Sequence, residues 1–128
     1  ANAQPELPGI RVGEQPWEEG VLPELSGKGP FVLEAEDFSA LEESYVVPSF
    51  ELKPVALKES WELAWYTSLG TLSPRETGGA DFGGGEGRHR VEWQPPPDAQ
   101  AQEVRFWVVV RDGRGGLSWL TRKVRYSP

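Results

Sequence analysis

The stretch that decides the fold spans residues 103–126, EVRFWVVVRDGRGGLSWLTRKVRY. Valine and aromatic residues fill its first arm, and these residue types favour a pleated, half-buried surface. Asp112-Gly113 and Gly115-Gly116 follow, and glycine takes positive φ at little steric cost. The stretch therefore predicts two β-strands joined by a tight, glycine-rich turn.

The first strand of this hairpin alternates between two sets of side chains, as a strand with one buried face does. The inward set is apolar: Val104, Phe106, Val108 and Val110. The outward set mixes cations with apolar residues: Arg105, Trp107, Val109 and Arg111. Because a hairpin alone is only marginally stable in water, we expect the rest of the chain to supply a second sheet that covers the inward set.

The chain upstream holds short segments typical of strands, separated by Gly and Pro, at residues 31–36, 45–47, 50–52, 61–68 and 90–94. No helical crossover lies between them, which disfavours a parallel α/β architecture. We therefore predict an all-β fold, an antiparallel β-sandwich of about seven strands, over residues 31–128. Alternation along 61–68 places Trp65 on the inner face, so Trp65 is predicted at the buried centre.

Residues 1–30 form a separate N-terminal segment in this scheme. They are rich in Pro, Gly and Glu and sustain neither a strand period nor a helix period. Two interpretations stay open for them: a mobile tether, or a docking segment in which Trp17 packs onto the domain.

The composition excludes several classes of function. The net charge is −7, of which residues 1–64 carry −9 and residues 65–128 carry +2. No dominant basic surface is offered to phosphates, so nucleic acid is not an expected partner. Cysteine is absent, which removes disulfides, thiolate metal sites and thiol nucleophiles. No apolar run approaches the roughly 20 residues of a membrane-spanning helix, so a transmembrane chain is not expected.

Three motifs carry a resemblance to a known family: LAWYTSLGTL at 63–72, VEWQPP at 91–96 and VVVRDGRGGLSW at 108–119. Together and in this order they resemble bacterial immunoglobulin-like domains of the PKD/cadherin-like kind. The resemblance implies an immunoglobulin-like sandwich on a secreted, cell-surface or lipoprotein chain. It implies an extracellular, periplasmic or outer-membrane-associated location, and a role in adhesion, binding or spacing.

The chain departs from the family pattern at two places. Lys58-Glu59-Ser60 stands where members have an acidic turn before the tryptophan strand, which puts an inherited calcium site in doubt. The glycine-rich loop from Arg75 to Arg90 is longer than the resemblance implies. Its glycine density predicts a loop that is mobile from Thr77 to Gly87 in the free protein, with Phe82 as its only aromatic anchor.

The sequence offers no catalytic constellation. His89 is the only histidine and lies between Arg88 and Arg90, so we predict a surface histidine and no enzymatic activity. Asp112 at the hairpin turn has two interpretations: a carboxylate that accepts hydrogen bonds from its own turn, or one ligand of a calcium ion. No other cofactor is predicted.

The candidate binding site is the outward face of the closing hairpin. Its residues are Arg105, Trp107, Arg111 and Trp119, joined by Tyr66 from the segment 61–68. Tryptophan beside arginine is typical of a protein interface, so we predict a non-enzymatic module that binds a protein or spaces other parts. A carbohydrate-binding module that stacks sugars on the same tryptophans is the alternative. We expect this face to be covered, either by residues 1–30 or by a partner.

Overall fold

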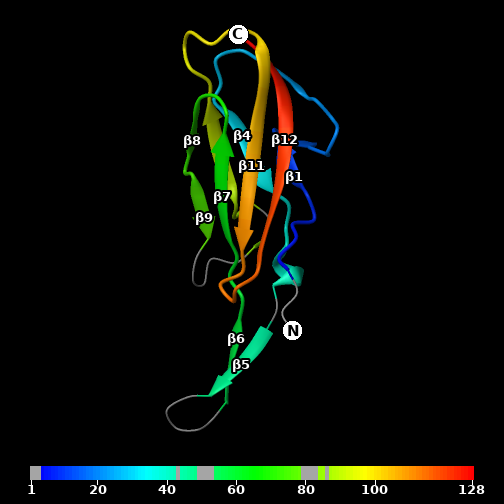
Figure 1. The fold of residues 1–128 in the computed structure, drawn as a ribbon, viewed down its shortest axis with the longest axis vertical. Coiled ribbons are helices and arrows are strands. Elements are labelled where there is room, and N and C mark those ends of the chain that lie inside the picture. The colour runs from blue at the N-terminus through cyan, green and yellow to red at the C-terminus, as the bar shows by residue number, and fades with distance from the viewer. Residues whose placement is uncertain (1–3, 43, 49–53, 79–83, 86) are drawn as a thin grey trace.

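The computed structural model describes residues 4–42, 44–48, 54–78, 84–85 and 87–128. Two five-stranded sheets pack face to face, and a separate two-stranded ladder stands beyond one end of them (Figure 1). The fold is all-β, as predicted. The described residues include one helical turn, the 3-10 helix η1 (Ser39–Leu41), and no helix among them is long and apolar enough to cross a membrane.

Sheet A, as we name the first sheet, has the order β2-β1-β4-β10-β8. Its strands are β2 (Gln15–Pro16), β1 (Ile10–Val12), β4 (Phe31–Ala35), β10 (Arg90–Gln94) and β8 (Thr71–Ser73). Sheet B has the order β3-β12-β11-β7-β9. Its strands are β3 (Glu24–Ser26), β12 (Leu117–Ser127), β11 (Gln102–Arg111), β7 (Glu62–Thr67) and β9 (Glu76–Gly78).

The closing hairpin is the centre of sheet B. Strands β11 and β12 pair antiparallel from Gln102↔Tyr126 to Arg111↔Leu117, and β7 pairs with the other edge of β11. Gly113 and Gly115 in the turn have φ values of +78° and +89°, which glycine adopts without strain. The predicted inward set is buried, so the predicted alternation is confirmed.

The core lies between the two sheets and is dominated by aromatic rings. Trp65, predicted at the buried centre, is 1% exposed, which confirms that prediction. Trp93 from sheet A meets Phe106 from sheet B edge to face, with ring centroids 5.2 Å apart. Such edge-to-face pairs add about 0.5–1.5 kcal/mol beyond the area that they bury.

The N-terminal segment takes part in both sheets. Strand β1 pairs antiparallel with β4, and β3 pairs parallel with the end of β12. Trp17 is 1% exposed, lies edge to face with Phe106 at 5.2 Å, and donates its indole N–H to the carbonyl of Lys123 at 3.0 Å. The described part of residues 1–30 is therefore docked. The described residues form twelve strands; three of them belong to this segment, and the nine from β4 to β12 already exceed the seven or so that the sequence indicates for residues 31–128.

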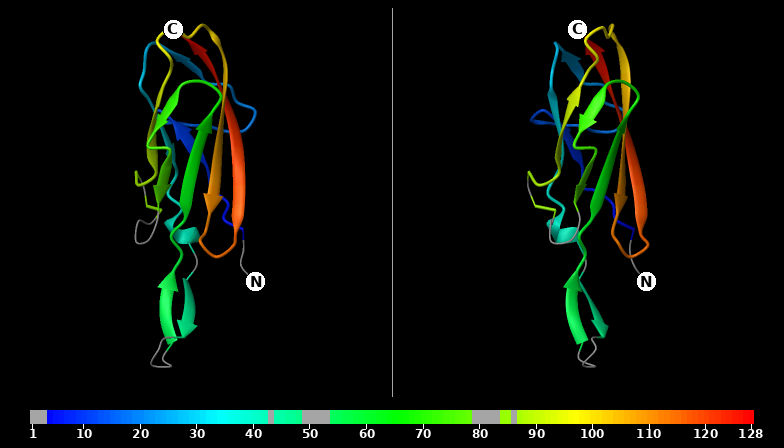
Figure 2. Two further views of the ribbon diagram at one scale, coloured as in Figure 1. Left: turned by 60° about the vertical axis from the view of Figure 1, so that its left-hand side comes forward. Right: turned by 90° about the vertical axis from the view of Figure 1, so that its left-hand side faces the viewer.

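The ladder of β5 (Ser44–Pro48) and β6 (Pro54–Lys58) projects from the end of the sandwich beyond the β11–β12 turn (Figures 1 and 2). Its base is fixed by two buried carboxylates, one on each side. Glu42 accepts a hydrogen bond from the backbone N–H of Trp61 at 3.0 Å, and Glu59 accepts one from the Trp61 indole at 3.1 Å. The predicted strand segment 50–52 lies outside the described residues.

The glycine-rich loop is described only in part. Residues 79–83 and 86 lie outside the described residues, so the predicted mobility of 77–87 and the predicted anchor Phe82 are not addressed. Gly84 is buried: its N–H donates to Glu42 at 2.9 Å and its carbonyl accepts from the N–H of Phe38 at 2.9 Å. This part of the loop is tied to the end of the sandwich.

Candidate functional site

All five candidate residues lie on one surface, the face of sheet B that points away from the core. Alternation places Arg105, Trp107 and Arg111 of β11 on this outer face, because the residues between them are buried. The register sets Tyr66 of β7 beside Trp107, and Trp119 of β12 beside Val109. The outer face of sheet B therefore carries aromatic side chains from three adjacent strands.

Two of these aromatic side chains are highly accessible. Trp119 is 68% exposed and Tyr66 is 52% exposed, while Trp107 between their strands is half-buried. The other four tryptophans, Trp17, Trp61, Trp65 and Trp93, are buried. An indole left in water forgoes the large burial that tryptophan otherwise provides, so this face is the candidate interaction site.

The described N-terminal residues do not cover this face. Trp17 contacts Phe106, which belongs to the inward set of β11, and Trp119 is 68% exposed beside the docked N-terminal residues. The N-terminal segment therefore contacts sheet B from its inner side, through Trp17, and at its edge, through β3. Cover by a partner stays a prediction.

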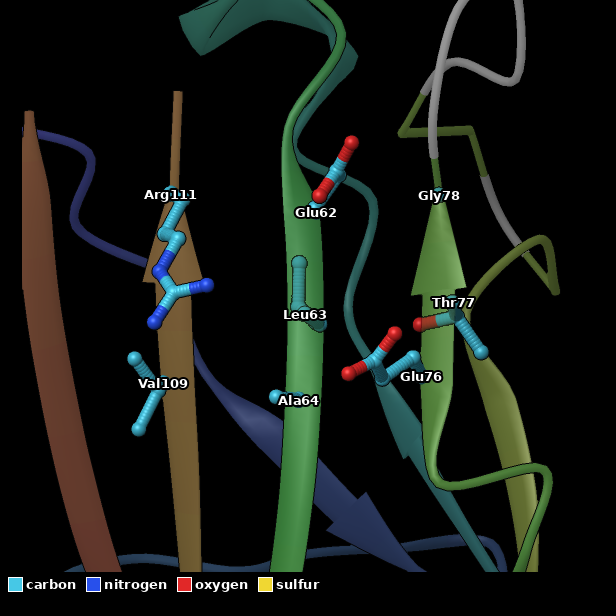
Figure 3. A pocket seen from close by; sticks show the side chains of 8 residues that line it. All are labelled: Glu62, Leu63, Ala64, Glu76, Thr77, Gly78, Val109 and Arg111. Atoms are coloured by element: carbon cyan, nitrogen blue, oxygen red, sulfur yellow. The ribbon is translucent and has the colours of Figure 1, made fainter. Parts of the chain in front are cut away.

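Beside the aromatic side chains the outer face is hollowed. A depression of about 290 Å³ lies over β7, between β11 and β9 (Figure 3). Its lining is Glu62, Leu63, Ala64, Glu76, Thr77, Gly78, Val109 and Arg111. The small side chain of Ala64 leaves the room, with the Glu76 carboxylate on one side of it and the Arg111 guanidinium on the other.

His89 is buried, so the prediction of a surface histidine is wrong. It is 1% exposed, its Nδ1 lies 2.6 Å from the Thr77 hydroxyl, and its ring packs against Phe38 with centroids 4.9 Å apart. Alternation explains the position: His89, Val91 and Trp93 are buried, whereas Arg90 and Glu92 are exposed. Extending the alternation of β10 back by one residue from Arg90 would have predicted that His89 is buried.

Asp112 has the turn role in the structure. Its Oδ1 accepts hydrogen bonds from the backbone N–H of Arg114 at 2.7 Å and of Gly116 at 2.8 Å. Within the described part of the chain, no group of three or more His, Asp or Glu side chains is placed to hold a metal ion.

Replacing Asp112 by Ala is expected to lower the free energy of unfolding by about 1–3 kcal/mol, because two N–H groups of a partly buried turn lose their acceptor. Urea denaturation measures the loss, and Asp112→Asn is the control because it keeps an acceptor oxygen at the same place.

The melting temperature of the wild type is expected to be the same with and without Ca²⁺. A calcium-dependent rise that Asp112→Ala removes would favour the calcium interpretation instead.

Comparison of the chain with protein-family models, with curated proteins and with solved structures finds no match. The site is therefore characterised by its own geometry. Sequence reasoning missed the hollow, because its lining comes from three strands whose pairing no single segment reveals. The one signal was Ala64, a small residue on the same face as Tyr66.

Proposed function

We propose that this chain is a non-enzymatic binding module of immunoglobulin-like type, which binds a protein through the outer face of sheet B. The cell surface or the periplasm of a bacterium is the proposed setting, and this part of the proposal rests on the family resemblance. A spacer role for the sandwich is compatible with such binding.

The strand order supports the immunoglobulin-like assignment. The run β1-β4-β10-β8 in sheet A corresponds to strands A-B-E-D of such a sandwich, and β12-β11-β7 in sheet B corresponds to G-F-C. The buried Trp65 on β7 takes the place of the core tryptophan on strand C. The chain differs in the inserted β5–β6 ladder and in β9, which returns to β7 after β8 has joined sheet A.

The observation that carries the proposed binding role is the exposure of Trp119 on the same face as Trp107, Tyr66 and two arginines. Tryptophan, tyrosine and arginine are the residues enriched among those that dominate binding energy at protein interfaces. The buried polar side chains have structural contacts instead: His89 with Thr77, Glu42 with Trp61 and Gly84, and Glu59 with Arg114. These contacts support a non-enzymatic role.

Carbohydrate binding is the second candidate, because Tyr66 and Trp107 are neighbours on adjacent strands and offer rings for stacking. The two candidates differ in what else the site supplies. Arg105 and Arg111 beside the rings suit a protein surface with carboxylates, since guanidinium and carboxylate form paired, charge-assisted hydrogen bonds.

A photo-crosslinking amino acid in place of Leu117, which is exposed on the same face of β12 and leaves Trp119 intact, tests the proposal. In an envelope extract, we expect a crosslink to a protein, and unlabelled wild-type chain is expected to compete with its formation. The Trp119→Ala variant is expected to compete at least tenfold less effectively, as for a residue that dominates an interface. The same crosslinker at Glu92, exposed on β10 of sheet A, is the control. Equal crosslinking from both positions would contradict the proposal. Binding on a glycan array that Trp119→Ala abolishes would favour the carbohydrate candidate.

A further inference from the structure

One pair of side chains on the outer face of sheet B brings two positive charges together. The register sets Arg105 of β11 directly opposite Lys123 of β12, and both side chains are exposed. Neither forms an ion pair within the part of the chain that the structure describes. Like charges at directly opposite positions of an antiparallel pair destabilise a sheet, so this pair lowers the stability of the free chain.

Two other arginines of this face have opposite charges beside them instead. Arg111 of β11 lies opposite Glu62 of β7, and Arg125 of β12 lies opposite Glu103 of β11. A second carboxylate, that of Glu24 on β3, belongs to the residue on the other side of Arg125. The like-charge pair is therefore confined to one row of the sheet, in a chain whose net charge is −7.

A second hollow of the outer face lies at this pair. It has a volume of about 280 Å³, and its lining is Ser68, Glu103, Val104, Arg105, Trp107 and Lys123. The Ser68 hydroxyl accepts the backbone N–H of Arg105 at 3.0 Å, so its own O–H remains to donate. The guanidinium, the ammonium and this hydroxyl are all donors. The hollow therefore suits a group with anionic oxygens, such as a carboxylate.

The indole of Trp107 determines what accompanies the carboxylate. Trp107 is the next outward residue of β11 after Arg105 and lines the same hollow. A guanidinium binds a carboxylate through paired hydrogen bonds, and an aromatic face binds an apolar group. In extended chains, side chains two residues apart lie on the same side, about 7 Å from each other. An extended segment with an acidic and an apolar residue two positions apart has the spacing of Arg105 and Trp107.

The extent of the face favours a polypeptide as the occupant. Lys123 and Trp119 are outward residues of β12 that lie four positions apart, which is about 13 Å along a strand. A segment of extended chain spans this distance, whereas one sugar ring does not. The acidic residues elsewhere in the chain oppose such binding only weakly, because salt at physiological concentration screens exposed charges beyond about 8 Å.

We infer that the partner protein presents an extended acidic segment to this hollow. Its Asp or Glu lies against Arg105 and Lys123, and an apolar side chain two positions away lies against Trp107. This inference rests on the proposed function and names the chemistry of the partner. Charge complementarity identifies the occupant, because a carboxylate between the two cations removes the repulsion that they have in the free chain.

The test selects binders of the full chain from random linear peptides displayed on phage. Enriched peptides are expected to carry Asp or Glu two positions from an aliphatic or aromatic residue. Lys123→Glu is expected to weaken their binding at least about tenfold, because it sets like charges against each other. Lys28→Glu, which makes the same change at an exposed position between β3 and β4, is expected to leave binding unchanged. With Arg105→Glu added to Lys123→Glu, the same library is expected to yield peptides enriched in Lys or Arg.

The melting temperature of the free Lys123→Glu variant distinguishes lost binding from lost folding. The change places a carboxylate opposite Arg105, so the melting temperature is expected to rise by about 1–4 °C while binding of the acidic peptides falls. A variant that binds less because it is misfolded would melt at a lower temperature, and that result would overturn the inference.

Three other results would also overturn it: no enriched peptide, enriched peptides without Asp or Glu, or acidic peptides that bind Lys123→Glu as tightly as the wild type. Binding of polygalacturonate that Lys123→Glu abolishes, with no peptide enriched, would assign the hollow to an anionic carbohydrate. The proposed function is tested separately by crosslinking from position 117. If that crosslink depends on Trp119 while the enriched peptides lack carboxylates, the inference fails and the proposed function stands. If the crosslink does not depend on Trp119 and no peptide is enriched, both fail.

Discussion

Replacing Trp65 by Ala is expected to lower the free energy of unfolding by about 3–5 kcal/mol, a large share of the 5–15 kcal/mol of a typical domain. Trp65 is 1% exposed on β7, which pairs with both β11 and β9 in sheet B. Removing its indole leaves a cavity that these strands cannot close, because their positions are fixed by the ladder hydrogen bonds. Urea denaturation followed by circular dichroism measures the change.

Trp119→Ala is the matched control, since it makes the same chemical change at an exposed position of the same sheet. Its effect on the free energy of unfolding of the monomer is expected to stay within about 0.5 kcal/mol. Equal losses for Trp65→Ala and Trp119→Ala would contradict the assignment of the two faces of sheet B.

A comparison with Trp93 sharpens this prediction. The indole N–H of Trp93 donates to the carbonyl of Leu69 at 2.7 Å, whereas that of Trp65 has no hydrogen-bond partner among the described residues. Phenylalanine at position 65 therefore removes an unsatisfied donor, while at position 93 it removes a hydrogen bond and leaves the Leu69 carbonyl with the Thr67 hydroxyl as its donor. The loss of stability is expected to be larger for Trp93→Phe, by about 0.5–1.5 kcal/mol.

Replacing Gly70 by Ala is expected to lower the free energy of unfolding by about 2–5 kcal/mol. Gly70 has a φ of +80° between β7 and β8, which costs a residue with a side chain about 1–2 kcal/mol. An added Cβ would lie 2.4 Å from the carbonyl oxygen of Gln94 and 2.8 Å from Nε1 of Trp93. The turn must shift, and with it the indole hydrogen bond to Leu69.

Gly113→Ala separates the two causes. Gly113 has a similar φ of +78°, but an added Cβ there has no atom within 4 Å. Its expected loss is therefore only the backbone cost of about 1–2 kcal/mol. Thermal and urea unfolding of both variants gives the difference, and a Gly113→Ala loss as large as that of Gly70→Ala would show that close contact is not the cause.

The closing hairpin and the burial of Trp65 could be predicted because they depend on alternation within single strands. The residues from Val104 to Val110 can be assigned to the inner or the outer face of the sheet from alternation alone, without knowing which strands lie beside them. Placing Tyr66, Trp107 and Trp119 on one surface needed only the same rule. How close they lie depends on the register between β7, β11 and β12, which pairwise hydrogen bonds decide.

The N-terminal strands could not be predicted, for a physical reason. Strands β1, β2 and β3 have two or three residues each, too few to establish a period. Their conformation comes from the edges on which they dock, β4 for β1 and β12 for β3. The hollow over Ala64 was missed in the same way, because its sides are β9 and β11 and neither is near Ala64 in sequence.

Oxidation of exposed side chains by hydroxyl radicals, read out by mass spectrometry, tests the central claim that the outer face of sheet B is a binding surface. In dilute protein Trp119 is expected to react fastest, Trp107 more slowly, and Trp17, Trp61, Trp65 and Trp93 slowest, in the order of their exposure. With the crosslinked protein present, labelling of Trp119 is expected to fall several-fold while Leu41, exposed on η1, keeps its rate. An unchanged rate at Trp119 in the bound state would contradict the account.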